Sequence, residues 1–133
     1  MRPMRIQADL HVHTIASGHA FSTVAEVARE ASRRGLRAVG LADHGPALPG
    51  APNAVYFSAM RFLPLTMEGV RILRGIEANV VDSKGHLDLP RELLSRLDFV
   101  MFGFHPGCGL EAKAPAKNTA ALIAAMQNPG VKA

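Results

Sequence analysis

The stretch Asp9-Leu10-His11-Val12-His13-Thr14 decides how this chain folds, and His19 follows it in the next loop. From Ile6 to His13, apolar and polar residues alternate, which predicts a β-strand with one apolar face. Side chains at positions i and i+2 share a face, so His11 and His13 project together, with Cα atoms roughly 6–7 Å apart. Two imidazoles at this spacing can converge on one metal ion. The alternative is a pair of exposed histidines on an edge strand.

The remainder of the chain predicts strands and helices in alternation. Thr23 and Glu26 have the spacing of a capping box, which begins a helix that ends at Gly35. Pro90 in a first turn and Asn118 as an N-cap indicate two later helices. Strand–helix units in series favour a parallel sheet with right-handed crossovers. The further strands are expected at 36–42, 69–80 and 99–104, and the further helices at 56–63, 90–97 and 119–127.

Length and composition are typical of a soluble globular domain. The chain has 133 residues, of which 48% are hydrophobic and 20% are charged. No run approaches the ~20 apolar residues that a membrane helix needs, and no signal peptide is recognisable. The single cysteine, Cys108, cannot form an intramolecular disulfide, which favours a reducing compartment. We therefore expect a cytoplasmic protein without a membrane segment.

The basic balance of the chain does not by itself indicate a nucleic-acid partner. The formal net charge is +4, but the cations are scattered, and Arg29, Arg33 and Arg34 decorate one helix and its exit. There is no Trp, one Tyr and six dispersed Phe, so no aromatic stacking platform is evident. A solvated helix face explains the charge better than a track along a phosphate backbone.

Metal-ligand residue types stand at the ends of four successive expected strands. In parallel α/β folds, sites form where the carboxyl ends of the strands meet. Glu77 lies between Ile76 and Ala78, and a partly buried carboxylate there needs a cation or several hydrogen-bond donors. We therefore expect a metal site from these six residues: His11, His13, His19, His44, Glu77 and His105.

Other polar residues near these positions have two interpretations. Asp9 and Asp43 can act as acceptors that orient an imidazole, although Asp43 can also cap the following turn. Arg61 and Lys117 are weak candidates for contacting a phosphate, and otherwise are solvated charges. Cys108 follows His105 closely enough to reach a metal, but a free thiol with no role in the site is the simpler interpretation.

Four motifs taken together resemble the PHP (polymerase and histidinol phosphatase) superfamily. They are the opening stretch 9–14, Asp43-His44-Gly45-Pro46, the segment Arg74-Gly75-Ile76-Glu77-Ala78-Asn79, and Gly103-Phe104-His105. The sequences of these motifs are most similar to those of the YcdX-like phosphatase branch, and the similarity runs from about Gln7 to Pro129. It implies a distorted seven-stranded parallel (β/α) barrel. The chain would cover about the first four strand–helix units, as a single incomplete PHP domain over residues 1–133.

The resemblance also implies up to three divalent metal ions in a histidine-rich cleft. Imidazole-rich sites favour zinc, with manganese or iron as alternatives. The implied ligand sets are His11 and His13 for one ion, Glu77 bridging it to a second, His105 on that second ion, and His19 with His44 on the third.

The activity implied is hydrolysis of phosphate monoesters, with Glu77 as the metal-bridging catalytic residue and a metal-bound water as the attacking group. A small phosphorylated substrate is expected. The alternatives are a PHP-type histidinol phosphatase, or a nuclease or proofreading module attached to a polymerase. A non-catalytic metal-binding domain is a further alternative, because the family's late ligands have no counterpart after His105. A homo-oligomer, or a further C-terminal portion, would then complete the barrel.

Overall fold

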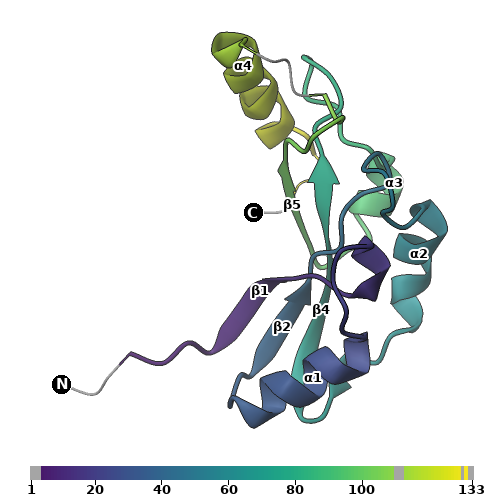
Figure 1. The fold of residues 1–133 in the computed structure, drawn as a ribbon, viewed down its shortest axis with the longest axis vertical. Helices are drawn as coiled ribbons and strands as arrows, with labels where there is room; N and C mark the ends of the chain where they lie inside the picture. Colours follow the sequence, from purple (N-terminus) through teal and green to yellow (C-terminus); the bar gives the residue numbers. More distant parts are fainter. Residues whose placement is uncertain (1–3, 110–112, 130, 132–133) are drawn as a thin grey trace.

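The computed structural model describes residues 4–109, 113–129 and 131. It shows an α/β fold in which a mostly parallel sheet curls into a half-barrel, with α1, α2 and α3 on one face (Figure 1). Each parallel strand pairs with the next parallel strand along the chain, as the strand–helix alternation predicts. These strands are β1 (Ala8–Val12), β2 (Ala38–Leu41), β4 (Val70–Asn79) and β5 (Phe99–Gly103).

Strand β4 is the centre of the sheet. Its first half pairs with β2, from Arg71 opposite Ala38 onward, and its second half pairs with β5, from Gly75 opposite Phe99 onward. A short antiparallel strand, β3 (Thr66–Met67), pairs with the start of β4. The sequence pattern missed β3 because two residues carry no periodicity. The parallel sheet that we expected is confirmed, and it accounts for about half of a TIM-like barrel.

The first helix forms as its capping box predicts. In α1 (Val24–Arg33), Thr23 Oγ1 accepts from the backbone N–H of Glu26, and the Glu26 carboxylate accepts from the backbone N–H of Thr23. Gly35 follows the helix with φ +73°, a left-handed conformation that glycine adopts without strain. The other helical segments are η1 (Ile15–Ser17), α2 (Ala54–Ala59), η2 (Met60–Phe62), α3 (Arg91–Leu94) and α4 (Pro115–Met126).

Three helices differ from their expected bounds. Helix α2 begins earlier, at Ala54, and ends at Ala59, where the 3-10 segment η2 follows it. Helix α4 begins at Pro115, not beyond Asn118, because proline lacks the N–H that the first turn leaves unpaired and its fixed φ suits that position. Helix α3 is only one turn long, and Pro90 precedes it as the N-cap residue. Within the described part of the chain, no helix is long and apolar enough to cross a membrane.

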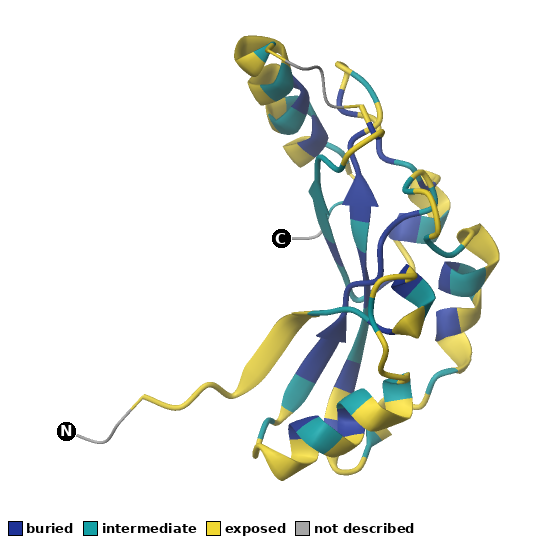
Figure 2. Cartoon of the chain, in the orientation of Figure 1, coloured by how far each residue is buried: buried dark blue, intermediate teal, exposed yellow. Residues whose placement is uncertain are grey.

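The two faces of the sheet are packed differently. Val39, Ile72 and Ile76 are at most 1% exposed on the face that the helices cover. On the opposite face, the Phe99 ring lies over Gly40 and Gly75, where an added Cβ would collide with it. Figure 2 shows that β4 is mostly buried, whereas β1 is exposed along most of its length.

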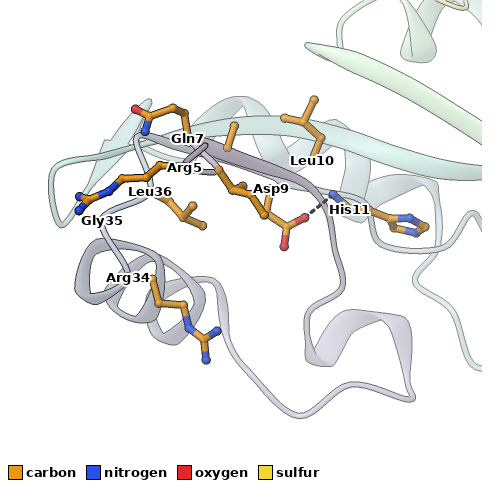
Figure 3. A pocket seen from close by; sticks show the side chains of 10 residues that line it. Arg5, Gln7, Asp9, Leu10, His11, Arg34, Gly35 and Leu36 are labelled. Carbon is orange, nitrogen blue, oxygen red and sulfur yellow. Dashed lines mark hydrogen bonds between the residues drawn. The ribbon is translucent and has the colours of Figure 1, made fainter. Parts of the chain in front are cut away.

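Strand β1 contains a β-bulge that overturns part of the expected alternation. From the pair Asp9–Val39 to the pair Val12–Leu41, β1 advances by three residues and β2 by two. The extra residue changes the phase of the strand, so Asp9 points toward the α1 side of the sheet and Leu10 away from it (Figure 3). The prediction that Asp9 shares a face with His11 and His13 is therefore wrong. The Asp9 carboxylate instead accepts from the backbone N–H of His11 at 3.1 Å within the bulge.

Candidate metal centre

All six expected ligands meet at the carboxyl ends of the parallel strands. Their imidazole rings form a continuous series, with centroids 5.1 Å apart for His11–His13, 4.5 Å for His13–His44 and 4.4 Å for His44–His105. His19 arrives from the loop after η1, and its centroid lies 4.8 Å from that of His44. His11 and His13 are close in sequence, but the others come from the loop after η1, from the end of β2, from β4 and from the end of β5, so the curl of the sheet brings the set together.

The Glu77 carboxylate lies at the centre of this series. Its Oε2 atom is 3.2 Å from Nε2 of His11, from Nε2 of His13 and from Nδ1 of His44. Its Oε1 atom is 3.3 Å from Nε2 of His105. Burial alone would raise the pKa of Glu77, but the hydrogen bond from His11 and the neighbouring imidazoles outweigh burial, so the pKa is lowered. The carboxylate is therefore ionised and surrounded by imidazole nitrogens.

Three groups of ligand atoms are compact enough to hold an ion. Within each group the candidate atoms lie within 4.8 Å of one another in the described part of the chain. Each pair that the family resemblance implies recurs inside one of these groups, and His13 and His44 each belong to two. The groups are His11–His13–Glu77, His44–Glu77–His105 and His13–His19–His44.

The donor set fits a divalent cation. Nδ1 of His44 is buried and forms no hydrogen bond, although it lies 3.2 Å from a Glu77 oxygen. Burial lowers the pKa of His44 to about 4, so at neutral pH the ring is uncharged and has a lone pair to donate. An unpartnered neutral imidazole beside a carboxylate and further imidazoles matches the ligand chemistry of zinc and related metals.

The buried carboxylate of Asp43 supports the part of the cluster that contains His13. The sequence alone left two roles open for it. Asp43 is 0% exposed and accepts from four donors: the backbone N–H and hydroxyl of Thr14, the Ser17 hydroxyl and the Tyr56 hydroxyl, at 2.6–2.8 Å. Asp43 contacts no imidazole directly. It reaches His13 through Ser17, whose Oγ lies 3.0 Å from Nδ1 of His13.

A second carboxylate supports the other end of the cluster. Asp88 accepts from the backbone N–H of Asn79 and from its side-chain amide, and Oδ1 of Asn79 lies 2.7 Å from Nδ1 of His105. Sequence reasoning missed Asn79, although a signal was present. Asn79 lies two residues beyond Glu77 on β4 and therefore shares its face.

The weaker candidates lie on other parts of the molecule. The Arg61 guanidinium, on η2, lies 4.6 Å from the centroid of the Phe62 ring. Lys117 is exposed in the first turn of α4. Cys108 is buried, its backbone N–H donates to the His105 carbonyl, and it belongs to none of the three ligand groups found in the described residues.

The chain is similar in sequence to a known domain family and to several proteins named as probable phosphatases. The PHP domain family matches residues 9–132. A probable phosphatase of Caldanaerobacter subterraneus subsp. tengcongensis is 48% identical over 128 residues, which cover 96% of this chain and 50% of that protein. Probable phosphatases of Acetivibrio thermocellus and Syntrophotalea carbinolica are 49% and 44% identical, with 98% and 96% of this chain and 54% and 53% of theirs covered. The chain spans about half the length of the curated relatives it matches.

Proposed function

The chain belongs to the PHP domain family, and from this premise we propose that it forms part of a metal-dependent phosphoesterase that hydrolyses phosphate monoesters. The names of its relatives support the phosphatase class. The observation that carries the proposal is the position of Glu77, whose carboxylate lies 3.2–3.3 Å from nitrogens of four imidazoles. A carboxylate among imidazoles is a donor set that a divalent cation would bind.

Each ligand group has a defined part in this proposal. His11, His13 and Glu77 would hold one ion, Glu77 and His105 with His44 a second, and His19 with His13 and His44 a third. Such ions supply Lewis-acid activation of water and neutralise charge on a phosphate group.

The protein side chains contribute the placement and the protonation state of the ligands. Burial lowers the pKa values of His13 and His44, so both rings stay neutral and available as ligands at neutral pH. Phe99 covers the sheet over Gly75, two residues before Glu77 on the same face of β4. A phosphorylated substrate would therefore approach from the open side of the half-barrel.

Metal content tests the ligand assignment directly. We expect the metal-free chain to take up zinc, and more weakly manganese or iron, as measured by elemental analysis after dialysis and by calorimetric titration. Glu77→Ala should lower the affinity by more than about 100-fold, the upper end of the effect of losing an outer-shell residue. Glu92→Ala, an exposed glutamate on α3, is the matched control. Normal metal uptake by Glu77→Ala would contradict the assignment.

Turnover separates the candidate activities. With zinc or manganese added, release of phosphate from p-nitrophenyl phosphate is expected, whereas trimming of DNA from its 3′ end would favour the nuclease alternative. The absence of histidine beyond His105 favours a second candidate for this chain by itself, a metal-binding domain without turnover. Tight metal uptake without phosphate release would support that candidate.

We also propose that further strands complete the barrel. One edge of β1 pairs with no other described strand, and it borders an open groove lined by β1, by the segment before it with Arg5 and Gln7, and by Arg34 at the C-cap of α1 (Figure 3). An unpaired strand edge with exposed Leu10 and Ile6 is a pairing site for another strand. The length of the relatives favours a further portion of a longer chain over a second copy. A monomer of 133 residues by native mass spectrometry that also releases phosphate at full rate in a turnover assay would contradict this proposal.

A further inference from the structure

Two of the candidate ligands present the same ring nitrogen to Glu77 and have the other nitrogen occupied. Nε2 of His13 and Nε2 of His105 lie 3.2 and 3.3 Å from the Glu77 carboxylate. Nδ1 of His13 contacts the Ser17 hydroxyl, and Nδ1 of His105 contacts the Asn79 amide oxygen. A neutral imidazole carries one proton, and the partner of Nδ1 decides which nitrogen carries it.

The surroundings of Ser17 direct the proton of a neutral His13 ring to Nδ1, because Nε2, although 3.2 Å from Oε2 of Glu77, forms no hydrogen bond with that carboxylate. Its hydroxyl lies 2.7 Å from Oδ1 of Asp43, and the carboxylate can only accept, so the single hydroxyl proton is directed there. The Ser17 oxygen also accepts from the backbone N–H of His44 at 3.1 Å. Its remaining lone pair faces Nδ1 of His13, which must therefore donate. His13 is consequently protonated on Nδ1 and has a free lone pair on Nε2.

The surroundings of Asn79 lead to the same result at the other end of the cluster. Its Nδ2 atom faces the Gly45 carbonyl at 3.1 Å and the Asp88 carboxylate, and both of these groups can only accept. A flipped amide would place oxygen against these two oxygens, so the orientation is determined by chemistry. Oδ1 must then accept from Nδ1–H of His105, which leaves Nε2 of His105 unprotonated.

We propose that Ser17 with Asp43, and Asn79 with Asp88, are positioning pairs that hold His13 and His105 in the Nδ1–H tautomer before any metal binds. Both rings then offer Nε2 to the ion without a tautomer change. The inference rests on the proposed metal site for its purpose, but the tautomers themselves are a property of the metal-free chain.

Two further residues support these pairs. The Tyr56 hydroxyl donates to Oδ2 of Asp43 at 2.6 Å, and burial together with that hydrogen bond raises the pKa of Tyr56, so the hydroxyl keeps its proton. Gly45 leaves room for Asp88, because a Cβ at position 45 would collide with the Asp88 carboxylate. The orientation of each imidazole therefore depends on residues that do not touch it.

The first test needs no substitution. Long-range nitrogen–proton correlation spectra of the chelator-treated chain, recorded above neutral pH, distinguish the two tautomers of each histidine. We expect His13 and His105 to carry the proton on Nδ1. A spectrum in which either ring is protonated on Nε2 would overturn the inference for that ring, whether or not the chain binds metal.

The second test removes the partners. Ser17→Ala should return His13 to a mixture of tautomers, and Asn79→Ala should do the same for His105, with zinc affinity lowered by about 10–100-fold in each case. Ser95→Ala and Asn53→Ala, which remove exposed groups that bond the backbone of α3 and α2, are the matched controls. Circular dichroism establishes that each variant is folded. A folded Ser17→Ala or Asn79→Ala variant with unchanged tautomers would contradict the proposal.

The two tests separate this inference from the proposed function. If the expected tautomers are present but the wild-type chain takes up no metal, the positioning pairs stand and the metal assignment fails. If metal is taken up by rings protonated on Nε2 in the free chain, the metal assignment stands and the positioning pairs fail.

Discussion

Strands β1 and β4 both end at the cluster, but they are held in place by different means. Strand β4 is ten residues long, pairs with β2 on one side and with β3 and β5 on the other, and buries Ile76 and Ala78 completely. Strand β1 pairs only with β2 among the described strands, contains a bulge, and leaves Leu10 47% exposed.

This difference shows where the geometry of the site originates. Glu77 is placed by the ladders on both sides of β4, so its position follows from the sheet itself. His11 and His13 cannot rely on such support. The Asp9 carboxylate holds the backbone of His11, and Ser17 together with Asp43 holds the ring of His13. Side-chain hydrogen bonds therefore fix the position of the histidines of β1, whereas backbone pairing within the sheet fixes the position of Glu77 in β4.

The largest effect is expected when the buried carboxylate is removed. Asp43→Ala leaves four donors without their acceptor, which should lower the free energy of unfolding by about 4 kcal/mol. Asp9→Ala removes one exposed hydrogen bond in β1 and should cost less than about 1 kcal/mol. Urea denaturation monitored by circular dichroism measures both. Similar losses for the two variants would show that Asp43 is not a structural centre.

Truncation of apolar residues tests the two strands directly. Ile76→Ala in β4 should lower the free energy of unfolding by about 2–4 kcal/mol, because it leaves a cavity in a fully buried position. Leu10→Ala in β1 should change it by less than about 1 kcal/mol, since that side chain is half exposed. Chemical denaturation of both variants is the measurement. A costly Leu10→Ala substitution would mean that another chain covers β1 under the conditions used.

The pH dependence of stability adds a smaller effect, which arises on the buried side of the cluster. Burial lowers the pKa of His44 from 6.5 to about 4, and His13 shifts in the same direction. At a pH between the two pKa values of His44, the unfolded chain binds a proton that the folded chain does not. The free energy of unfolding should therefore fall as the pH drops from 6.5 toward 4. Urea midpoints of the metal-free chain measure this fall.

His44→Gln should make the fall with decreasing pH less steep, because it removes the group that protonates only on unfolding. His86→Gln, in the exposed turn where His86 pairs with Asp82, is the matched control. Equal slopes for wild type and His44→Gln would show that His44 is not held neutral by burial.

Hydrogen exchange should show the smallest difference, because it reports local opening. Backbone amides of β4 should exchange only with global unfolding, whereas those of β1 should exchange through local opening. Added zinc should slow exchange at His11 and His13 more than at Ile76, because the ion would tie the free strand to Glu77. Equal slowing in both strands would indicate global stabilisation without a specific tie.

Much of the fold could be predicted because it depends on local signals. Alternation of apolar and polar residues located β1, and the Thr23–Glu26 capping box located α1. Strand β3 could not be predicted from two residues, and the start of α4 was misplaced because Asn118 was preferred to Pro115. The bulge in β1 depends on pairing with β2, which the sequence of β1 does not contain.

The cluster was easier to predict than its supports. Five of the six candidate ligands stand at or near strand ends, which converge in a parallel sheet, and His19 follows in the loop after η1. The supports join residues that are far apart in sequence, such as Ser17 with Asp43 and Tyr56 with Asp43. No periodicity predicts such contacts, because they join loops that have no repeating pattern of their own. Asn79 is the exception, since it shares a strand face with Glu77.

The bulge in β1 has a consequence for how this protein tolerates insertions and deletions. Leu10 and His11 together face Gly40 of β2, so the segment before the bulge and the segment after it keep independent phases. Deleting Leu10 would restore regular pairing while His11 and His13 still point toward Glu77. The candidate ligands His11 and His13 therefore keep their direction when the chain ahead of them changes by one residue, whereas a one-residue deletion in β4 before Glu77 would turn Glu77 away from the histidines.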